Sequence, residues 1–545
     1  MRRFESELNN NGITIASVIE RNVGFGPNKL AVVDDRGRYT YVDVSALATS
    51  VARSLIALGV EPGGRVACLM RNRFEWVVSC VATAQIGAVF VPINTWYRRG
   101  ELAWTLLHTG CSVFLSESEF LGHDYHDDLR TVEPAITTAA AGELKGTALP
   151  NLRSIVYLER AHPGAFGWQE FLELGRHVGH AELDQRRAAK SGGDPFLILY
   201  TSGSTGRPKG VVLPEGAQLQ NGIGIGSRRG IVAEDAIWLG SPLFYGLGSA
   251  NCLPVALTAG ATLVLQDRFD PEHTMSLIER EQCSTFYGMS NMIRQLYEAP
   301  NYHPGRLASL SKGTCGIQQA ERRLLLTEMG VAGATASYGA TEVCGNCFGG
   351  YPDDSLELKL DTCGKLLPGF EAKIVDRDTG FSLKRGEVGI LNVRGHTAIG
   401  YLQSPIETGQ VFGQDGFYST GDLGSLDSDG YFRWTGRIKE MIKTGGINVA
   451  PVEIEYLLLE HPSVHEAYVV GIADSDRGEA AVAFVVADDG ISEADIKKYV
   501  RTLAASFKVP ASVLFRKSKE IPRTASGKVD KLTLATEAGG GVIAS

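Results

Sequence analysis

Residues 200–210 read YTSGSTGRPKG and follow directly on PFLIL, an apolar run at 195–199. The apolar run predicts a short buried strand. The glycines of the following stretch let the backbone come close to a ligand, and its N–H groups and hydroxyls, together with Lys209, offer donors and positive charge. The sequence therefore predicts a loop, at the end of a strand, that binds a polyphosphate.

Two other interpretations of this loop fit less well. A Walker loop needs a glycine, four residues and then Gly-Lys-Ser/Thr, and Pro208 stands where the second glycine belongs. A flexible Gly/Ser connector has a similar composition. It fits poorly between a buried strand on one side and the apolar residues 211–213 on the other.

The composition indicates a large, water-soluble enzyme. A chain of 545 residues is too long for one hydrophobic core, so we expect at least two domains. Hydrophobic residues make up 44% and charged residues 21%, which is ordinary for a globular protein. The net charge of −9 argues against binding of nucleic acid, and no apolar run reaches the roughly 18 residues of an integral membrane segment. Nine scattered cysteines are typical of reduced thiols, so we expect a cytoplasmic protein.

Strands and helices alternate over the first hundred residues. Apolar residues at Val44, Leu47, Val51 and Leu55 have helical spacing. The pattern predicts a helix at 42–58, a strand at 65–70, a helix near 75–86 and a strand at 88–92. Alternation of this kind favours mixed α/β layers over an all-helical or all-β fold.

The texture of the sequence changes twice toward the C-terminus. From about residue 370, short strands alternate with turns, which predicts a β-rich subdomain. A charged segment at 436–439 then precedes about a hundred residues, enough for a small domain. The expected fold class is α/β, with a large N-terminal domain of mixed αβ layers and a β-rich subdomain at 1–438, and a small mobile α+β C-terminal domain at 439–545.

Two short motifs carry residues suited to a nucleotide. YGATE at 338–342 places an aromatic ring beside a glycine, where the ring can stack on a base, and adds a hydroxyl and a carboxylate suited to Mg²⁺. YSTGDL at 418–423 places Asp422 after a glycine, and a carboxylate that accepts from both ribose hydroxyls is usual in nucleotide sites. Taken alone, each motif is equally well explained by a turn.

Two lysines near the C-terminus have both a functional and an ordinary explanation. Lys439 lies in GRIKEMIKTGG at 436–446 and is either a solvated linker charge or a pivot about which one domain turns. Lys528 ends PRTASGK at 522–528 and is either a surface lysine or a cation that reaches a reacting carboxyl oxygen. The residues alone leave both alternatives open.

Three further patterns resemble sites without meeting their requirements. GIGIG at 222–226 lacks the third glycine and the preceding strand of a dinucleotide-binding loop. CGNC at 344–347 is a lone C-x-x-C without the second pair of a zinc site. His123 and His126 stand among aspartates and are better explained as part of an acidic surface loop. We expect no nucleotide or metal at these places.

In this order and spacing, the motifs identify a family. The chain resembles the adenylate-forming superfamily of acyl-CoA synthetases, amino-acid adenylation domains and firefly luciferase, and most of all the AMP-forming acid–CoA ligases. The resemblance rests on YTSGSTGRPKG at 200–210, SYGATE at 337–342, YSTGDL at 418–423, GRIKEMIKTGGINVAPVEIE at 436–455, FKVP at 507–510 and PRTASGK at 522–528. It implies that ATP and Mg²⁺ activate a carboxylic acid to an acyl-adenylate, and that the acyl group then passes to the thiol of coenzyme A (CoA).

The resemblance also implies a role for each matching residue. The phosphates of ATP would contact Thr201, Ser202, Gly203, Ser204, Thr205, Gly206 and Lys209. Adenosine, phosphate and metal would contact Tyr338, Gly339, Thr341, Glu342, Asp422 and Arg437, with Glu342 as the Mg²⁺ ligand. Lys528, Glu342 and Lys209 would be the catalytic residues, Lys439 the hinge, and Gly445 and Gly446 the lining of the thiol tunnel.

The implied acid pocket departs from the family pattern. Its lining would comprise Tyr245, Gly248, Tyr287, Gly316, Gly339, Cys344 and Gly345. Tyr245 stands where a His is common in the family, and it is no counter-ion for the ammonium group of an amino acid. GIQQ at 316–319 replaces the usual Gly-Gly-Ala-Pro. Aromatic and small residues leave an apolar volume, so we expect a bulky hydrophobic or aromatic carboxylate rather than acetate or an amino acid.

Several alternatives stay open. A stand-alone enzyme that loads an acyl carrier protein would share every motif, although no carrier domain follows Lys528. A luciferase-like oxygenase uses the same scaffold. A non-catalytic nucleotide-binding protein would have lost a catalytic residue, and the joint presence of Lys209, Glu342, Asp422 and Lys528 argues against it. A homodimer is one option for the assembly.

Overall fold

The computed structural model describes residues 12–201, 208–316, 319–377, 379–437, 442–449, 451–522 and 529–539. The chain divides into two compact units, and each is described by itself. The first comprises Met1–Thr95, Thr105–Leu199 and Gly210–Thr435, and the second Trp96–Trp104, Tyr200–Lys209 and Gly436–Ser545. The domain boundary expected at residue 438 stays a prediction, because residues 438–441 lie outside the described ranges.

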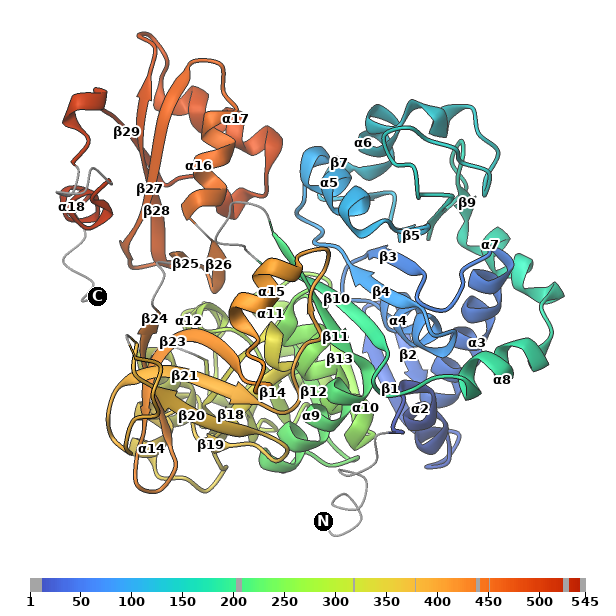
Figure 1. The fold of residues 1–545 in the computed structure, drawn as a ribbon. Helices are drawn as coiled ribbons and strands as arrows, with labels where there is room; N and C mark the ends of the chain where they lie inside the picture. The colour runs from blue at the N-terminus through green and yellow to red at the C-terminus, as the bar shows by residue number, and fades with distance from the viewer. Residues whose placement is uncertain are drawn as a thin grey trace. The chain divides into compact units, whose positions relative to one another are not determined.

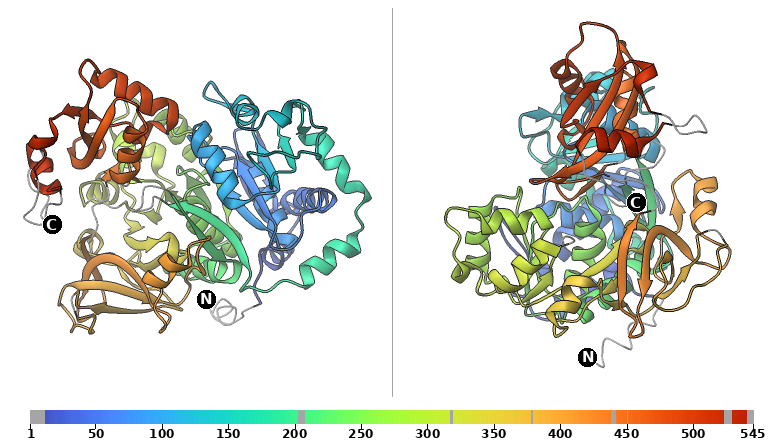
Figure 2. Two further views of the ribbon diagram at one scale, coloured as in Figure 1. Left: turned by 45° about the horizontal axis from the view of Figure 1, so that its top comes forward. Right: turned by 90° about the vertical axis from the view of Figure 1, so that its left-hand side faces the viewer.

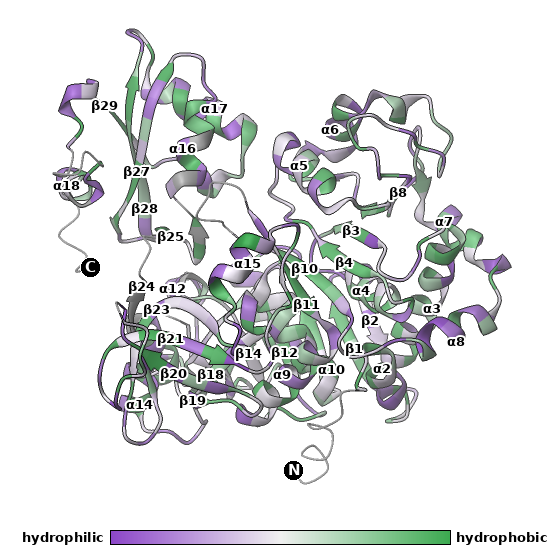
Figure 3. Ribbon diagram, viewed as in Figure 1, coloured by the Kyte–Doolittle hydropathy of each residue, from purple (hydrophilic) through white to green (hydrophobic). Residues whose placement is uncertain are grey.

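The larger sheet contains the strand that precedes the glycine-rich loop. Among the described residues its order is β22 (Gly400–Tyr401), β11 (Lys209–Pro214), β10 (Pro195–Thr201), β4 (Val89–Pro92), β3 (Arg65–Leu69), β5 (Val113–Ser116), β8 (Ser154–Tyr157) and β9 (Phe166–Gly167). The pairs from β10·β4 to β8·β9 are parallel, and β11 pairs antiparallel with β22. Figure 3 shows hydrophobic residues along β10 and β4, as expected for parallel strands with both faces covered. The strand expected at 195–199 is confirmed as β10.

A second sheet lies in the same unit. Over the described residues its order is β16 (Gly333–Thr335), β15 (Lys312–Thr314), β14 (Thr285–Tyr287), β12 (Ala236–Leu239), β13 (Thr262–Leu265), β1 (Leu30–Asp34) and β2 (Gly37–Thr40). Its pairs are parallel from β16 to β1, and only β1·β2 is antiparallel among the described pairs of this sheet. The predicted mixed α/β layers are confirmed.

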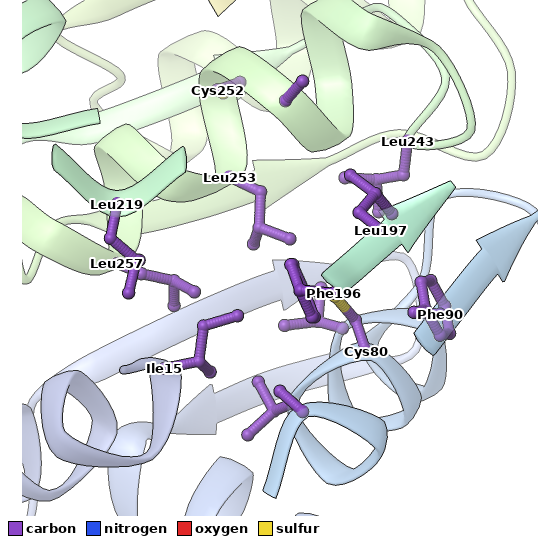
Figure 4. Close-up of a cluster of buried hydrophobic side chains, with 14 of the residues drawn as sticks. Ile15, Cys80, Phe90, Phe196, Leu197, Leu219, Leu243, Cys252, Leu253 and Leu257 are labelled. Carbon is purple, nitrogen blue, oxygen red and sulfur yellow. The ribbon is translucent and has the colours of Figure 1, made fainter. Parts of the chain in front are cut away.

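Helices between the sheets follow the predicted pattern. Thr40 caps helix α3 (Tyr41–Ala57), whose buried residues include Val44, Val51 and Leu55. Helix α4 (Phe74–Gln85) is buried on almost all sides. Figure 4 shows side chains of α2 (Ile15–Val23), α9 (Glu215–Arg228), α10 (Leu253–Ala259), β4 and β10 meeting in one cluster, including Ile15, Phe90, Phe196, Leu219 and Leu257.

Helix α9 explains the GIGIG pattern. Residues 222–226 lie within this helix and form no nucleotide loop, as expected. A Cβ at Gly222 would lie 2.8 Å from the carbonyl carbon of Pro254 in α10, so the glycine permits the two helices to approach closely. The glycine at position 222 is therefore explained by the packing of α9 against α10.

The β-rich part of the first unit contains two smaller sheets. The first joins β17 (Ser337–Ala340), β18 (Gly345–Gly349) and β19 (Lys365–Leu366), and the second joins β20 (Glu371–Val375), β21 (Gly389–Arg394), β23 (Tyr418–Leu426) and β24 (Phe432–Arg437). Strands β17 and β18 form a hairpin in which Tyr338 pairs with Phe348. Figure 2 shows the second of these sheets, in orange and brown tones, as a layer of its own.

The second unit is an α+β fold built on a long antiparallel pair. Strands β27 (Val464–Asp474) and β28 (Gly478–Ala487) pair along their length, with β25 (Ile442–Thr444), β26 (Ile447–Val449) and β29 (Ser512–Phe515) beside them. Helices α16 (Pro451–Leu459) and α17 (Glu493–Leu503) cover a core that includes Val469, Ala483 and Ile496 (Figure 1).

The remaining described elements connect or flank these sheets. They are α5 (Arg99–Thr109), β6 (Glu119–Phe120), β7 (His123–Asp124), α6 (Tyr125–Val132), α7 (Trp168–Leu174), α8 (His180–Ala188), α11 (Pro271–Glu281), α12 (Ser290–Tyr297), α13 (Gln319–Arg323), α14 (Leu356–Asp361), α15 (Pro405–Val411) and α18 (Lys531–Glu537). Across the described ranges, every helix is too short or too polar to cross a lipid bilayer.

His396 makes the stability of the first unit sensitive to acid. Its Nε2 is buried without a hydrogen-bond partner, and burial lowers the pKa of this imidazole to about 4. The unfolded side chain takes up a proton near pH 6.5. The contribution of neutral His396 to stability is therefore present above about pH 6.5 and is lost as the pH falls toward 4.

We therefore expect the free energy of unfolding of His396→Gln to depend less on pH, between pH 7 and pH 5, than that of the wild type. Between pH 7 and pH 5 the free energy of unfolding of the wild type should fall by about 2 kcal/mol more than that of the variant. Denaturant titration at both pH values measures the difference. The exposed residue His177, replaced by Gln, serves as the control and should leave the wild-type slope. Equal slopes for wild type and His396→Gln would contradict the assignment.

Candidate functional site

The two predicted adenosine contacts Tyr338 and Asp422 lie on strands of different sheets, and a side-chain hydrogen bond joins them. Asp422 of β23 is 2% exposed. It accepts hydrogen bonds from the Tyr338 hydroxyl at 2.7 Å and from Trp434 Nε1 at 3.1 Å. Burial, reinforced by Asp422, raises the pKa of Tyr338 well above its usual value, so the phenol keeps its proton and donates it to the carboxylate. The result is an oriented carboxylate beside an aromatic ring.

The ring of Tyr338 is fixed by other aromatic residues. Phe432 of β24 meets it edge-on at 5.0 Å between centroids, and Phe348 of β18 meets it at 6.3 Å. Phe348 and Phe432 are themselves stacked at 4.9 Å. Such contacts hold the plane of the Tyr338 ring in one orientation.

The metal-binding candidate follows β17 directly. Thr341 and Glu342 lie in η6 (Thr341–Val343), a single 3-10 turn. One Glu342 oxygen, Oε1, accepts from the Tyr401 hydroxyl at 2.9 Å, and its backbone carbonyl accepts from Ala398 N at 2.8 Å. Within the described ranges, no Lys or Arg forms an ion pair with Glu342. An oriented carboxylate without such a partner fits the ligand that Mg²⁺ requires.

Two glycines allow the hairpin to lie close to its surroundings. A Cβ at Gly339 would lie 1.9 Å from the Gly345 carbonyl oxygen. Gly345 has φ +122°, and a Cβ there would lie 2.8 Å from the Ala250 carbonyl oxygen in η3 (Gly246–Cys252), a π-helical turn. Asn221 of α9 donates to the carbonyl oxygens of Val343 and Cys344 at 2.9 and 3.0 Å. The segment from 337 to 345 is therefore held by contacts within the hairpin, with η3 and with α9.

Most of the predicted acid-pocket residues lie on this hairpin, beside or within η3, or contact η3, whereas Gly316 lies beside α12. Tyr245 is half-buried, and its hydroxyl accepts from Asn94 Nδ2 at 3.4 Å. Gly248 and Cys344 are buried, and Gly316 has φ +79°, where an added Cβ would lie 2.6 Å from the Ser290 hydroxyl. Tyr287 is buried at the end of β14. Its hydroxyl donates to Asn251 Oδ1 at 3.1 Å, so the phenol is held at a fixed position.

Two side chains that no sequence motif indicated, Trp434 and Arg229, contact these residues. Trp434 donates to Asp422, and Arg229 donates to the Tyr287 hydroxyl and, at 3.2 Å, to the Ser337 hydroxyl. Arg229 follows Arg228 at the end of α9, where basic residues are ordinary because they complement the helix dipole. Nothing in the sequence distinguished Arg229 from an ordinary basic residue at the end of a helix.

Several predicted site residues belong to the second unit or lie outside the described ranges. Thr201 ends β10, Lys209 begins β11 and Arg437 ends β24. Gly445 and Gly446 form the turn between β25 and β26 with φ of +59° and +78°. Outside the described ranges are Ser202, Gly203, Ser204, Thr205, Gly206, Lys439 and Lys528. Their roles stay predictions.

The CGNC pattern and His123 have ordinary structural surroundings. All nine cysteines remain buried thiols, Cys344 and Cys347 included. His123 pairs with Asp128 at 2.8 Å. Over the part of the chain that the structure describes, no cluster of His, Cys, Asp and Glu is arranged to hold a metal ion.

Comparison with known proteins gives the same assignment over the whole length. The family described as AMP-binding enzyme matches residues 19–402, and the AMP-binding enzyme C-terminal domain matches residues 453–528. The putative acyl-CoA synthetase YngI of Bacillus subtilis (strain 168) is 32% identical over 530 residues, covering 96% of each chain. The mitochondrial medium-chain acyl-CoA ligase ACSF2 of Rattus norvegicus is 30% identical, covering 96% of this chain and 87% of its own. The amide bond synthetase McbA of Marinactinospora thermotolerans has a similar structure, with a TM-score of 0.78 at 27% identity, covering 96% of this chain and 99% of its own.

The close approach at Gly339 predicts the effect of adding one methyl group to the hairpin. Gly339→Ala should lower the free energy of unfolding by about 2–3 kcal/mol, because the new Cβ collides with backbone atoms that cannot move aside. Gly349→Ala in the same hairpin is the control. Its Cβ would lie 3.4 Å from the flexible Arg228 side chain, and it should cost less than about 1 kcal/mol. Denaturant unfolding measures the free energy of unfolding of both variants. Equal decreases in this free energy would show that the close contact at Gly339 does not determine the cost of the added methyl group.

Proposed function

Because this chain belongs to the family of AMP-binding enzymes, we propose that it joins a bulky hydrophobic or aromatic carboxylic acid to CoA through an acyl-adenylate. The chain is an ATP-dependent, AMP-forming acid–CoA ligase that uses ATP, Mg²⁺ and CoA. In the proposed reaction, a carboxylate oxygen attacks the α-phosphorus of ATP and pyrophosphate leaves. The CoA thiol then attacks the acyl carbon and AMP leaves.

The observation that carries the proposal is the Tyr338–Asp422–Trp434 arrangement with Glu342 four residues beyond Tyr338. The Asp422 carboxylate is held by two donors at 2.7 and 3.1 Å, so its acceptor positions are preorganised for ribose hydroxyls. The fixed ring of Tyr338 offers a surface for adenine. These groups suit one nucleotide whose base and sugar lie along β17.

Glu342 suits the metal that accompanies the phosphates. Mg²⁺ usually binds through one or two carboxylates and the phosphates of its substrate, and it neutralises charge that builds up at phosphorus. The Tyr401 hydroxyl orients Glu342, and burial together with Glu342 raises the pKa of that phenol so that it stays a donor. Thr341, its neighbour in η6, is the proposed phosphate contact.

Other roles are proposed from the motifs. Thr201, Ser202, Gly203, Ser204, Thr205, Gly206 and Lys209 contact the phosphates, and Gly339 and Arg437 contact the adenosine. Lys528 balances the charge of the reacting carboxyl oxygens, Lys439 is the hinge, and Gly445 and Gly446 line the path of the thiol. Two further proposals concern the setting: a cytoplasmic location, supported by nine cysteines that all remain thiols, and a homodimer.

The proposed acid site has aromatic and small residues. Tyr245 and Tyr287 provide aromatic surface, while Gly248, Gly316, Cys344 and Gly345 leave room for a large acid. Burial raises the pKa of Tyr287, so this phenol keeps its proton at physiological pH. The site therefore lacks a carboxylate at these positions that would select an amino acid.

Carboxylate-dependent pyrophosphate release tests the proposal. Purified protein with Mg-ATP should release pyrophosphate with hydrophobic or aromatic acids, and thioester should form with free CoA rather than with a carrier protein. A preference for acetate or amino acids would refute the proposed acid class, and thioester on a carrier alone would favour the loading enzyme. Absence of pyrophosphate with every acid would refute adenylation itself.

Lys528→Ala should reduce the rate of adenylation on the order of 10²-fold or more, because one preorganised charge contact at a transition state has that scale. The measurement is acid-dependent pyrophosphate release at saturating ATP. Lys519→Ala removes an exposed lysine nearby in the sequence and should leave the rate unchanged. Wild-type adenylation by the Lys528→Ala enzyme would remove Lys528 from the reaction.

Tyr338→Phe should raise the KM for ATP by about fivefold, because Asp422 loses the orienting hydrogen bond from the Tyr338 hydroxyl at a cost of about 1 kcal/mol. Tyr431→Phe is the matched control. It deletes a similar hydroxyl, which donates to Asp354 at 2.6 Å away from these residues, and it should leave the KM unchanged. Equal effects on the KM would mean that the Tyr338 hydroxyl acts only on stability.

A further inference from the structure

Arg229 is a buried cation with unusual partners. It is 2% exposed and follows helix α9. Its Nε lies 3.4 Å from the Thr335 hydroxyl, Nη1 lies 3.4 Å from Asn251 Oδ1, and Nη2 lies 3.2 Å from the Ser337 hydroxyl. Nη1 also donates to the Tyr287 hydroxyl. Each of these acceptors is electrically neutral.

Other buried arginines are compensated in ordinary ways. Arg73 forms ion pairs with Glu75 at 2.7 Å and Glu117 at 2.9 Å. Arg322 donates to backbone carbonyl oxygens, among them those of Gly316 and Thr362, each at 3.1 Å. Among the buried arginines of the described ranges, only Arg229 has neither a carboxylate nor a backbone carbonyl as partner.

This arrangement leaves a charge without its counter-charge. Removing a guanidinium from water costs several kcal/mol unless an anion or strong acceptors replace the water, and contacts at 3.4 Å are too long to do so well. A guanidinium has five N–H donors in a planar fork that matches a carboxylate in two-point contact. The neutral acceptors around Arg229 supply no counter-charge, and a carboxylate would supply one.

The position of Arg229 relates it to the proposed acid site. Its partner Tyr287 and the residue Asn251 of η3 both border that site, and Asn251 Nδ2 would lie 3.5 Å from a Cβ at Gly345. Its third partner, Ser337, begins β17, whereas Thr341 and Glu342 follow the end of that strand. At about 3.3 Å per residue, β17 spans roughly 10 Å from Ser337, the partner of Arg229, to Ala340, the residue before Thr341.

The residues between Ser337 and Glu342 are exposed enough for a ligand to reach them. All residues from Ser337 to Glu342 are half-buried, and so are residues 245–247 on the segment that faces them. The residues that flank both segments in the chain, at 334–336, 343–344 and 248–250, are buried. A Cβ at Gly246 would lie 3.5 Å from the Thr341 hydroxyl, which brings the two segments together. Partial exposure within a buried setting is what the wall of a site produces.

We propose that Arg229 binds a second carboxylate at the far end of the substrate, so that the preferred acids are dicarboxylic acids with an apolar body of roughly 10 Å. The inference rests on the proposed function and narrows its acid class. Tyr287, Asn251 and Ser337 hold the guanidinium in place beside the apolar part of the site. Arg229 is then a specificity-determining residue, which takes no part in the transfer of the acyl group.

Paired acids test this inference. Thioester formation is measured with octanedioate and octanoate, which differ only in the second carboxylate, and with 8-hydroxyoctanoate, which ends in a neutral acceptor. We expect the wild type to prefer octanedioate over octanoate in kcat/KM on the order of 10²-fold, since a site built to bind a polar group rejects the analogue that lacks it. Arg229→Met should abolish this ratio, and Arg229→Lys should keep part of it.

The neighbouring residue provides the control. Arg228 donates to the backbone carbonyl oxygens of Gly349, Lys365 and Leu366 and contributes to packing only, so Arg228→Met should keep the wild-type ratio even where it lowers stability. A wild-type preference for octanoate or for 8-hydroxyoctanoate would overturn the inference, and this result needs no variant to fold. An unchanged ratio in Arg229→Met would overturn it too. In both cases thioester formation with octanoate would leave the proposed function intact, whereas no pyrophosphate release with any acid would refute both.

Discussion

The close contact between the strands of the β17–β18 hairpin is the constraint on which the candidate site depends. At Gly339 the carbonyl oxygen of Gly345 occupies the space of a side chain, and Gly345 in turn lies against η3. Because this contact fixes the path of the hairpin, Tyr338 is directed toward Asp422 and Glu342 follows at the turn. One steric condition thus positions both the aromatic residue and the carboxylate of the proposed nucleotide site.

The same hairpin gives the site a direction. Its first residue, Ser337, lies beside Arg229, and the turn after its first strand carries Glu342. Between them the backbone is half-buried, in contrast to the fully buried strands of the parallel sheets. A substrate that follows β17 would therefore meet different chemistry at its two ends, the Arg229 cation at one and the Glu342 carboxylate at the other.

Local sequence patterns predicted the helices and strands better than they predicted which side chains contact one another. The apolar run at 195–199 and the helical spacing of Val44, Val51 and Leu55 correctly gave β10 and α3, because burial of one strand or helix face leaves a short-range trace. Tyr338 of the motif at 338–342 does contact Asp422 of the motif at 418–423, while the nucleotide role of both motifs stays a prediction. The Tyr401 contact to Glu342 spans 59 residues and the Arg229 contact to Tyr287 spans 58, and no local pattern records such distances along the chain. The phosphate loop and Lys528 remain predictions from their motifs.

Helix α9 links regions that the sequence keeps far apart. Asn221 in its middle holds the backbone of 343–344, while Arg229 at its end adjoins Tyr287, and Gly222 fits against α10. Insertion of one residue between positions 221 and 229 would rotate these groups by about 100° relative to one another. Changes of acid preference in this lineage should therefore arise by replacement of side chains at constant helix length, and alignments of its relatives should show gaps outside α9.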